Sequence, residues 1–214
     1  MKTIVRSLFG AALFAAACGG AQASPDSQKT VQLSKVILDT EGGVKGKIKG
    51  GTLCVFPSKW DIAGDKKTQD YERYDTLFSG KMKDLGFSVV TVSGDLFAAD
   101  DDKNKADLLV GAVLRPDTIN LCSSVNGEKG NMTLAVDWQI YDRNTHEVVA
   151  KATTTGDASQ EKFARDGLTQ MWNRAFLANL GALVDQGVIQ KYAGGPAIVP
   201  VAATSDAANA GAKP

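Results

Sequence analysis

The sequence feature that most restricts the fold is a strict alternation of apolar and polar residues between residues 132 and 141. The apolar side chains, at every second position, are Met132, Leu134, Val136, Trp138 and Ile140. Successive side chains of a strand point to opposite faces, so this pattern predicts a β-strand with one face in a core. Residues 142–145 have the composition of a turn, and we expect residues 147–154 to return as the antiparallel partner.

Further strands are expected on the N-terminal side of this hairpin. The most apolar candidate is 106–114, where almost no polar face remains, so both faces are expected to be covered. Pro116 interrupts this run, and the chain is expected to resume as a strand over 118–125 before the turn pair Asn126-Gly127. Two shorter strands are predicted, a buried first strand over 52–57 and another over 87–92.

Two segments have the periodicity of amphipathic helices. In residues 70–85 one face collects Tyr71, Tyr74, Phe78, Met82 and Leu85. Residues 160–186 have a wider apolar stripe, which indicates a helix that lies across a sheet. This order of elements predicts an α+β fold in which a mixed β-sheet has two helices packed on one face.

The N-terminus has the three-part organisation of a secretory signal peptide. Lys2 and Arg6 precede an apolar run over 8–17, which is too short to span a bilayer, and Ala21-Gln22-Ala23 is a cleavage site. Residues 15–19 also resemble a bacterial lipobox, in which Cys18 would be acylated and become the mature N-terminus. Lipidation at Cys18 would anchor the chain to a membrane, and the two cleavage sites remain alternatives.

These patterns divide the chain into four parts. Residues 1–23 are the signal peptide, and 24–51 are predicted to be a flexible polar tether in which only the apolar patch 36–38 has the composition of a strand. Residues 52–192 form a single domain. Residues 193–214 are rich in Ala, Gly and Pro, and we expect a disordered tail because they bury too little apolar surface to offset the entropy of ordering.

Charge and cysteine content exclude several classes of function. The 24 basic and 24 acidic residues balance and are mixed along the chain, which predicts neither nucleic-acid binding nor attraction to an anionic membrane. Cys54 and Cys122 are left to pair in an oxidising compartment, with two separate buried thiols as the alternative. His146 is the only histidine and no close cysteine pair exists, so neither a metal nor a cofactor is expected.

Catalytic groups are sparse. No G-x-S-x-G motif is present, and His146 lies in a predicted turn that does not hold a base in a pocket. A carboxylate-based hydrolase would need Asp137 together with Asp107 or Asp117 in one cleft. Each of these three positions is more typical of a solvated strand position or a local cap.

The candidate partner surface consists of Trp60, Arg115 and Asp117. Trp60 follows the first predicted strand in a loop, where a large aromatic side chain can serve as a binding anchor. Arg115 and Asp117 flank the break at Pro116, and such a break can mark a bulge or the rim of a site.

Three short segments carry a resemblance to a known fold: the strand end Val55-Phe56-Pro57, the strand 106–111 and the hairpin 141–149, in which His146 occupies a position where glycine is common. They resemble the periplasmic fold shared by the amino-terminal domain of TolB, the CsgG-type lipoproteins and the penicillin-binding-protein activator lipoproteins. The resemblance covers residues 52–190. It implies a domain that acts mainly by binding partners, and it carries no catalytic residue.

From these observations we expect a non-enzymatic, exported bacterial envelope protein that serves as an accessory, scaffold or regulator of an envelope assembly. Its location would be the periplasm or the periplasmic face of the outer membrane, with secretion as a further option. The expected partners are envelope proteins or further copies of the chain, joined through an exposed sheet edge. We expect membrane contact only through a lipid at Cys18. The alternatives are a hydrolase of polysaccharide or peptidoglycan and a small-ligand carrier.

Overall fold

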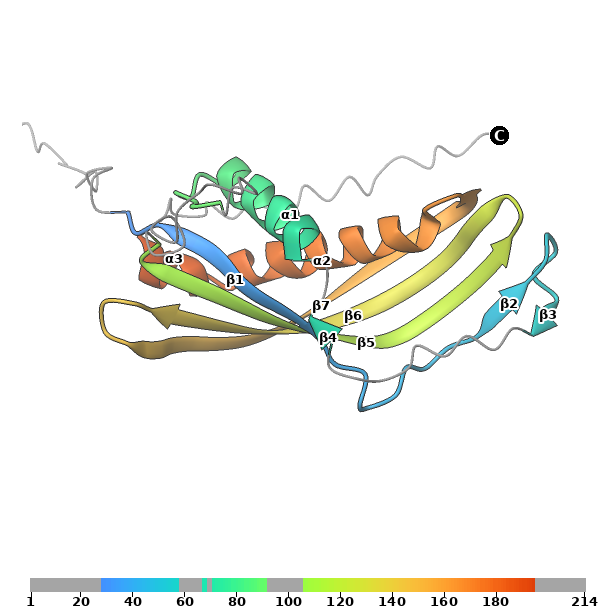
Figure 1. Ribbon diagram of the computed structural model, residues 1–214, viewed down its shortest axis with the longest axis horizontal. Helices are drawn as coiled ribbons and strands as arrows, with labels where there is room; N and C mark the ends of the chain where they lie inside the picture. The colour runs from blue at the N-terminus through green and yellow to red at the C-terminus, as the bar shows by residue number, and fades with distance from the viewer. Residues whose placement is uncertain (1–27, 58–66, 69–70, 92–105, 195–214) are drawn as a thin grey trace, which may run out of the picture.

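The computed structural model describes residues 28–57, 67–68, 71–91 and 106–194 (Figure 1). Three long strands form its frame: β5 (Leu108–Ser124), β6 (Gly127–Asp142) and β7 (Glu147–Ala164), paired as an antiparallel meander. The β5–β6 turn comes immediately before Gly127, as predicted. Gly127 has a φ of 105°, and a Cβ there would lie 2.1 Å from the Ala164 carbonyl oxygen, so this turn requires glycine.

Strand β5 is continuous through the predicted break. Pro116 is accommodated by a register shift between Pro116 and Thr118, so the two expected strands are one. A bulge is one of the few places where a strand can accept proline, which cannot donate a hydrogen bond to the ladder.

The segment predicted to be a tether lies against β5, which corrects the prediction for its described part. Strand β1 (Val31–Leu38) pairs in parallel with the first half of β5, and β2 (Ile48–Gly50) pairs in parallel with its end. The side chains of Val31, Leu33 and Val36 are fully buried. Burial of each such side chain contributes about 1.5–3 kcal/mol, which outweighs the Gly- and Lys-rich composition on which the tether was predicted.

The predicted strand over 52–57 is not buried. Only β3 (Phe56–Pro57) is a strand there, and it pairs with β2 at the edge of the sheet. The side chain of Leu53 is 82% exposed and that of Phe56 is 68% exposed. The run was interpreted as core because it is apolar, but the helices do not extend over it. On the same side of β5, β4 (Lys67–Thr68) pairs with the end of β1.

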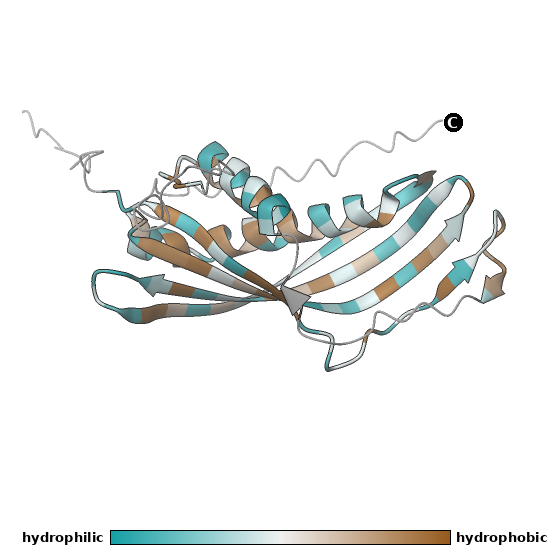
Figure 2. Cartoon of the chain, viewed as in Figure 1, coloured by the Kyte–Doolittle hydropathy of each residue, from teal (hydrophilic) through white to brown (hydrophobic). Residues whose placement is uncertain are grey.

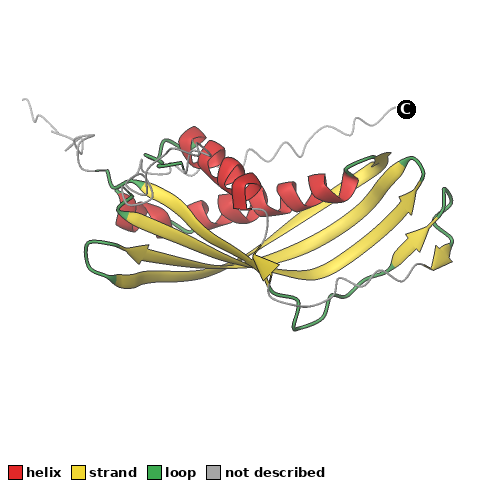
Figure 3. Cartoon of the chain, in the orientation of Figure 1, coloured by secondary structure: helices red, strands yellow, loops and turns green. Residues whose placement is uncertain are grey.

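Helices α1 (Tyr71–Asp84) and α2 (Gly167–Asp185) cover one face of the sheet, and α3 (Val188–Ala193) follows α2 (Figure 3). The α+β fold with a mixed sheet is confirmed. The second helix begins later than predicted, because residues 160–164 extend β7 and pair with the start of β6. The strand expected over 87–92 is reduced to a bridge between Val89 and Val31.

The core lies between the sheet and the helices. All five alternating apolar residues of β6 are buried in it, and the Phe176 ring of α2 contacts both Tyr74 and Trp138. Figure 2 shows apolar residues along β1 and the first half of β5, beneath the helices.

A short polar network crosses this core. The Trp138 indole N–H donates to the Thr154 hydroxyl at 2.8 Å, and that hydroxyl donates to Asn179 Oδ1 at 2.6 Å. The Asn179 amide donates in turn to the carbonyl oxygens of Leu134 and Ala175, at 2.9 Å each. Each of these buried polar groups therefore has a partner, as burial requires.

Several sequence predictions fall outside the described residues: the signal peptide over 1–23, the lipidation candidate Cys18, the candidate anchor Trp60 and nearly all of the tail over 193–214. In the part of the chain that the structure describes, no helix is long and apolar enough to cross a membrane.

Candidate functional site

The face of the sheet opposite α1 and α2, here called the open face, carries rows of polar side chains joined across strands. Within the described ranges no helix packs on it. One row joins Arg115 to Asp137, with a 2.8 Å contact, and Asp137 also accepts a 2.7 Å hydrogen bond from the Thr153 hydroxyl. Further along, the Thr133 hydroxyl donates to Asp157 at 2.6 Å. Such cross-strand pairs hold the polar side chains in fixed positions.

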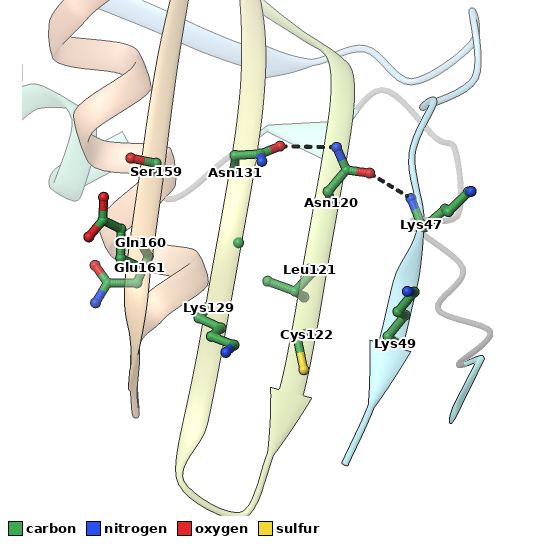
Figure 4. Close-up of a pocket in the computed structure, with 11 residues that line it drawn as sticks. Lys47, Lys49, Asn120, Leu121, Cys122, Lys129, Asn131, Ser159, Gln160 and Glu161 are labelled. Atoms are coloured by element: carbon green, nitrogen blue, oxygen red, sulfur yellow. Dashed lines mark hydrogen bonds between the residues drawn. The ribbon is translucent and has the colours of Figure 1, made fainter. Parts of the chain in front are cut away.

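A shallow hollow of about 580 Å³, here called the lysine hollow, lies toward the end of the open face (Figure 4). It is lined by three lysines, Lys47, Lys49 and Lys129, and by one acidic residue, Glu161. Among the described residues, none of the three lysines forms an ion pair. The hollow therefore presents excess positive charge.

Asparagine side chains fix the floor of the lysine hollow. The Asn120 amide donates to Asn131 Oδ1 at 3.0 Å, and Asn120 Oδ1 accepts from the Lys47 backbone N–H at 3.2 Å (Figure 4). The remaining lining includes Ser159 and Gln160, and no histidine. The arrangement offers ammonium and amide donors on a shallow surface, which suits binding of anionic or hydroxyl-rich groups and provides no nucleophile with an adjacent base.

Beyond the lysine hollow, the molecule ends in two turns, residues 51–57 and 124–127, here called the distal tip. A disulfide between Cys54 and Cys122, with 5.5 Å between the Cα atoms, joins the first turn to β5. The Gly51 backbone N–H also donates to the Ser123 carbonyl oxygen at 3.0 Å. Of the two alternatives for these cysteines, the structure has the bridged form.

Neither pair of carboxylates considered for a hydrolase, Asp137 with Asp107 or Asp137 with Asp117, is brought together. Asp137 pairs in register with Val113, six residues from Asp107 and four from Asp117 along β5. These spacings correspond to about 20 Å and about 13 Å of backbone, whereas glycosidase carboxyl groups lie roughly 5–9.5 Å apart.

Local partners also occupy two of these carboxylates. The Thr30 backbone N–H and hydroxyl each donate to Asp107 at 2.8 Å, and the backbone hydrogen bond is the largest cause that holds the pKa of Asp107 below its ordinary value. The hydrogen bond from Lys45, at 3.2 Å, lowers the pKa of Asp117. Both carboxylates are held ionised by structural bonds.

The candidate partner residues that the structure describes, Arg115 and Asp117, are exposed on β5 but belong to separate ion pairs, with Asp137 and Lys45. His146 lies in the exposed β6–β7 turn with a φ of 58°, and its Nδ1 is 3.4 Å from the Tyr141 hydroxyl. Glycine adopts a left-handed backbone more readily than other residues do. No group of three His, Cys, Asp or Glu side chains that could hold a metal occurs among the described residues.

The lysine hollow was missed at the sequence level, although a signal for it exists. Lys45, Lys47 and Lys49 alternate with other residues, and a period of two is the spacing of a strand. Because glycines surround them, the segment was assigned to a tether instead of a strand.

No family model matches the sequence, and no curated protein does. Among solved structures, a Xanthomonas campestris protein of family DUF330 is 12% identical over 77% of this chain and 83% of its own, with a TM-score of 0.36. The PelC dodecamer of Paraburkholderia phytofirmans is 13% identical over 76% and 91%, with a TM-score of 0.32. A minor lipoprotein of Acinetobacter baumannii is 14% identical over 69% and 91%, with a TM-score of 0.29. We draw no functional argument from similarity at this level.

Proposed function

We propose that this chain is exported into the bacterial cell envelope and acts there by binding a partner, not as an enzyme. The observation that carries the proposal is the Cys54–Cys122 disulfide. Structural disulfides persist in oxidising compartments and are rare in the cytosol. The disulfide agrees with the charged start, apolar run and cleavage site at the N-terminus.

The open face supports the binding role. Its polar side chains are committed to cross-strand hydrogen bonds, and its hollow is shallow and positively charged. A catalytic pocket requires a base or acid held against a reacting group and protected from water. The three carboxylates considered for that role are spread along the sheet, so we do not propose a hydrolase.

Export is tested by thiol accessibility in a bacterial host. The full chain carries a C-terminal tag, and cells are treated with a maleimide-polyethylene glycol reagent after denaturation, with and without reductant. We expect the mature protein in the envelope fraction, with both cysteines modified only after reduction. A matched chain that starts at Ser24 behind an initiator Met should stay in the cytosol with free thiols. Full-length protein recovered in the cytosol with free thiols would contradict export.

The mode of attachment is tested by intact mass. Lipidation at Cys18 predicts a mature chain that begins at Cys18 and carries acyl chains, and Cys18→Ser would release it from the membrane. Cleavage before Ser24 predicts a mass that Cys18→Ser leaves unchanged. The two results separate a membrane-anchored protein from a free periplasmic or secreted one.

The binding role is tested by site-specific photocrosslinking in living cells. A photoreactive phenylalanine analogue is placed at Lys129 in the lysine hollow and, as the control, at Glu72 on the exposed side of α1. We expect a covalent adduct with an envelope component at position 129 and none at position 72. Absence of adducts from positions 129, 131 and 159 alike would contradict a partner-binding open face.

A further inference from the structure

Exposed apolar side chains gather at one end of the molecule. Among the described residues, four of the five exposed large hydrophobic residues belong to the distal tip, whereas Val148 lies at the opposite end of the sheet. The four are Leu53, Val55, Phe56 and Val125, and Val125 is 99% exposed. Exposed apolar residues that gather at one end of a protein can mark a surface that contacts something other than water.

Pairing and covalent linkage hold the two turns of the distal tip together. Gly50 pairs with Phe56 on one side and with Ser123 on the other, so β2 lies between β3 and the end of β5 (Figure 1). The disulfide then ties Cys54 to Cys122. The apolar side chains are therefore held in a fixed arrangement, and little ordering entropy is lost when the tip binds.

Lysines lie directly behind the distal tip. Lys49 and Lys129 both pair in register with Cys122, one on each side of β5. Cys122 precedes Val125 by three residues, which places this row about 10 Å behind Val125. The first turn lies closer to the row, because Phe56 pairs with Gly50 and Cys54 is bonded to Cys122. Amphipathic elements on a membrane bury their apolar face roughly 5–10 Å into the boundary between headgroups and acyl chains. The lysine row is therefore at the depth of the headgroups when Val125 is at the acyl boundary, and the apolar side chains of the first turn lie near the row.

The nearest acidic residue on β6 is engaged elsewhere. Glu128 Oε2 accepts a 3.2 Å hydrogen bond from the Leu168 backbone N–H at the start of α2, where a carboxylate complements the helix dipole. The Lys129 ammonium lies 4.6 Å from the centre of the Phe163 ring, so Lys129 is held on the open face without an acidic partner. The positive row behind the tip is therefore available to an anionic surface.

We propose that the distal tip is a membrane-contact site, in which Val125 enters the acyl boundary of an anionic lipid surface, Leu53 and Phe56 lie at the interface between headgroups and acyl chains, and Lys49 and Lys129 lie among the headgroups. The small size of the distal tip argues against a protein partner there. A stable protein interface uses about 20–30 residues a side, whereas the tip offers four apolar side chains on two turns. The contact requires no acyl chain at Cys18. It goes beyond the sequence-based expectation, in which the membrane is contacted only through a lipid at Cys18.

The test is vesicle co-sedimentation of the oxidised, unacylated chain 24–214. We expect binding to phosphatidylglycerol-containing vesicles and much weaker binding to pure phosphatidylcholine. Leu53→Ser with Phe56→Ser should lower the partition coefficient by roughly tenfold to a hundredfold, since each exposed apolar side chain accounts for up to about one factor of ten. Val148→Ser is the matched control at the opposite end and should leave it unchanged. Lys49→Gln with Lys129→Gln should lower the partition coefficient about fivefold per lysine. The partition coefficient should then also depend less on the salt concentration.

Insertion depth provides an independent readout. Val125→Trp should gain fluorescence that brominated lipids quench, and Val148→Trp should not. The proposal is overturned if the native chain does not bind anionic vesicles, or if Leu53→Ser with Phe56→Ser binds as well as the native chain, which would reduce the contact to headgroup attraction. It is equally overturned if the chain is a dimer that this double variant separates, because a second copy would then cover the tip. Thermal unfolding confirms that each surface variant is folded.

Discussion

Strands β5 and β6 run from a region that is covered by helices to one that is not. Under α2, Trp138 of β6 is buried. Thr154 of the neighbouring β7 belongs to a hydrogen-bond network in which each buried polar group has a partner. At the distal tip they end in exposed apolar turns, held by a disulfide instead of a core. Packing therefore stabilises one region and a covalent bond the other. Substitutions in the first should change the free energy of unfolding. In the second, removal of the disulfide should change it too, whereas substitutions of the exposed side chains should mainly change binding.

The largest expected effect comes from Gly156, where α2 packs directly on β7. A Cβ there would lie 2.6 Å from the Ala175 carbonyl oxygen and 2.7 Å from Asn179 Nδ2. Gly156→Val should lower the free energy of unfolding by about 3–5 kcal/mol, because the helix must move off the sheet. Gly181→Ala is the control, since nothing lies within 4 Å of a Cβ added there. This variant should gain roughly 0.5–1 kcal/mol in free energy of unfolding. Equal urea midpoints for the two variants would refute the close packing.

A smaller effect is expected from removal of the disulfide. Cys54→Ser with Cys122→Ser should lower the free energy of unfolding by about 2–4 kcal/mol, because the bond closes a long loop in the unfolded chain. Hydrogen exchange should rise most in β2 and the distal tip, and α2 should stay protected. If α2 instead loses protection to the same degree, the two regions form one cooperative unit and the comparison fails.

The buried network should give the next effect. Thr154→Val keeps the side-chain shape but removes the acceptor of the Trp138 indole N–H and the donor to Asn179. We expect a loss of about 1–3 kcal/mol, since a buried donor is left without a partner. Thr153→Val, on the open face of the same strand, is the matched control and should cost less than about 0.5 kcal/mol. Chemical denaturation measures both, and similar losses would show that the network contributes nothing particular to the covered region.

The smallest effect concerns the end of β6 opposite the distal tip. Asp142 is buried and receives a 2.6 Å ion pair from Lys29, which is the largest cause that lowers its pKa. A lowered pKa in the folded state stabilises the fold above the unfolded value of about 4 and loses that contribution as pH falls toward the folded pKa. The Asp142→Asn variant should have a lower free energy of unfolding at neutral pH, and that free energy should fall less on acidification. Lys29→Met should have the same two effects. Unchanged acid sensitivity in both variants would contradict this account.

The parts of the fold that were predicted from sequence are those with a local signature. The period of two in β6, the helical face of α1 and the Asn126-Gly127 turn each report their own conformation. The boundary between β7 and α2 was misplaced because Gln160, Glu161 and Lys162 are polar and the strand pairing of this segment with β6 is a tertiary effect.

The candidate site was less predictable than the fold. The lysines of the hollow come from segments that are far apart in the sequence. Strand β2 and the part of β1 before residue 36 were missed because their partner, β5, comes much later. The apolar turn at 51–57 was interpreted as core, since local sequence does not show where the helices end. Cys54 and Cys122 were singled out correctly, but only the fold brings their Cα atoms within bridging distance.

The parallel pairing of β1 with β5 also determines when the chain can fold. At the start of this pairing, hydrogen bonds join Thr30 to Asp107, residues that are 77 positions apart. A contact of such long range forms slowly, because the intervening chain must be closed into a loop before the contact repays the entropy. As the chain emerges from its N-terminal end, β1 remains without its partner until β5 follows. For the export proposed above, this delay is useful, because the translocation machinery threads an extended chain and β1 has no partner strand until β5 emerges.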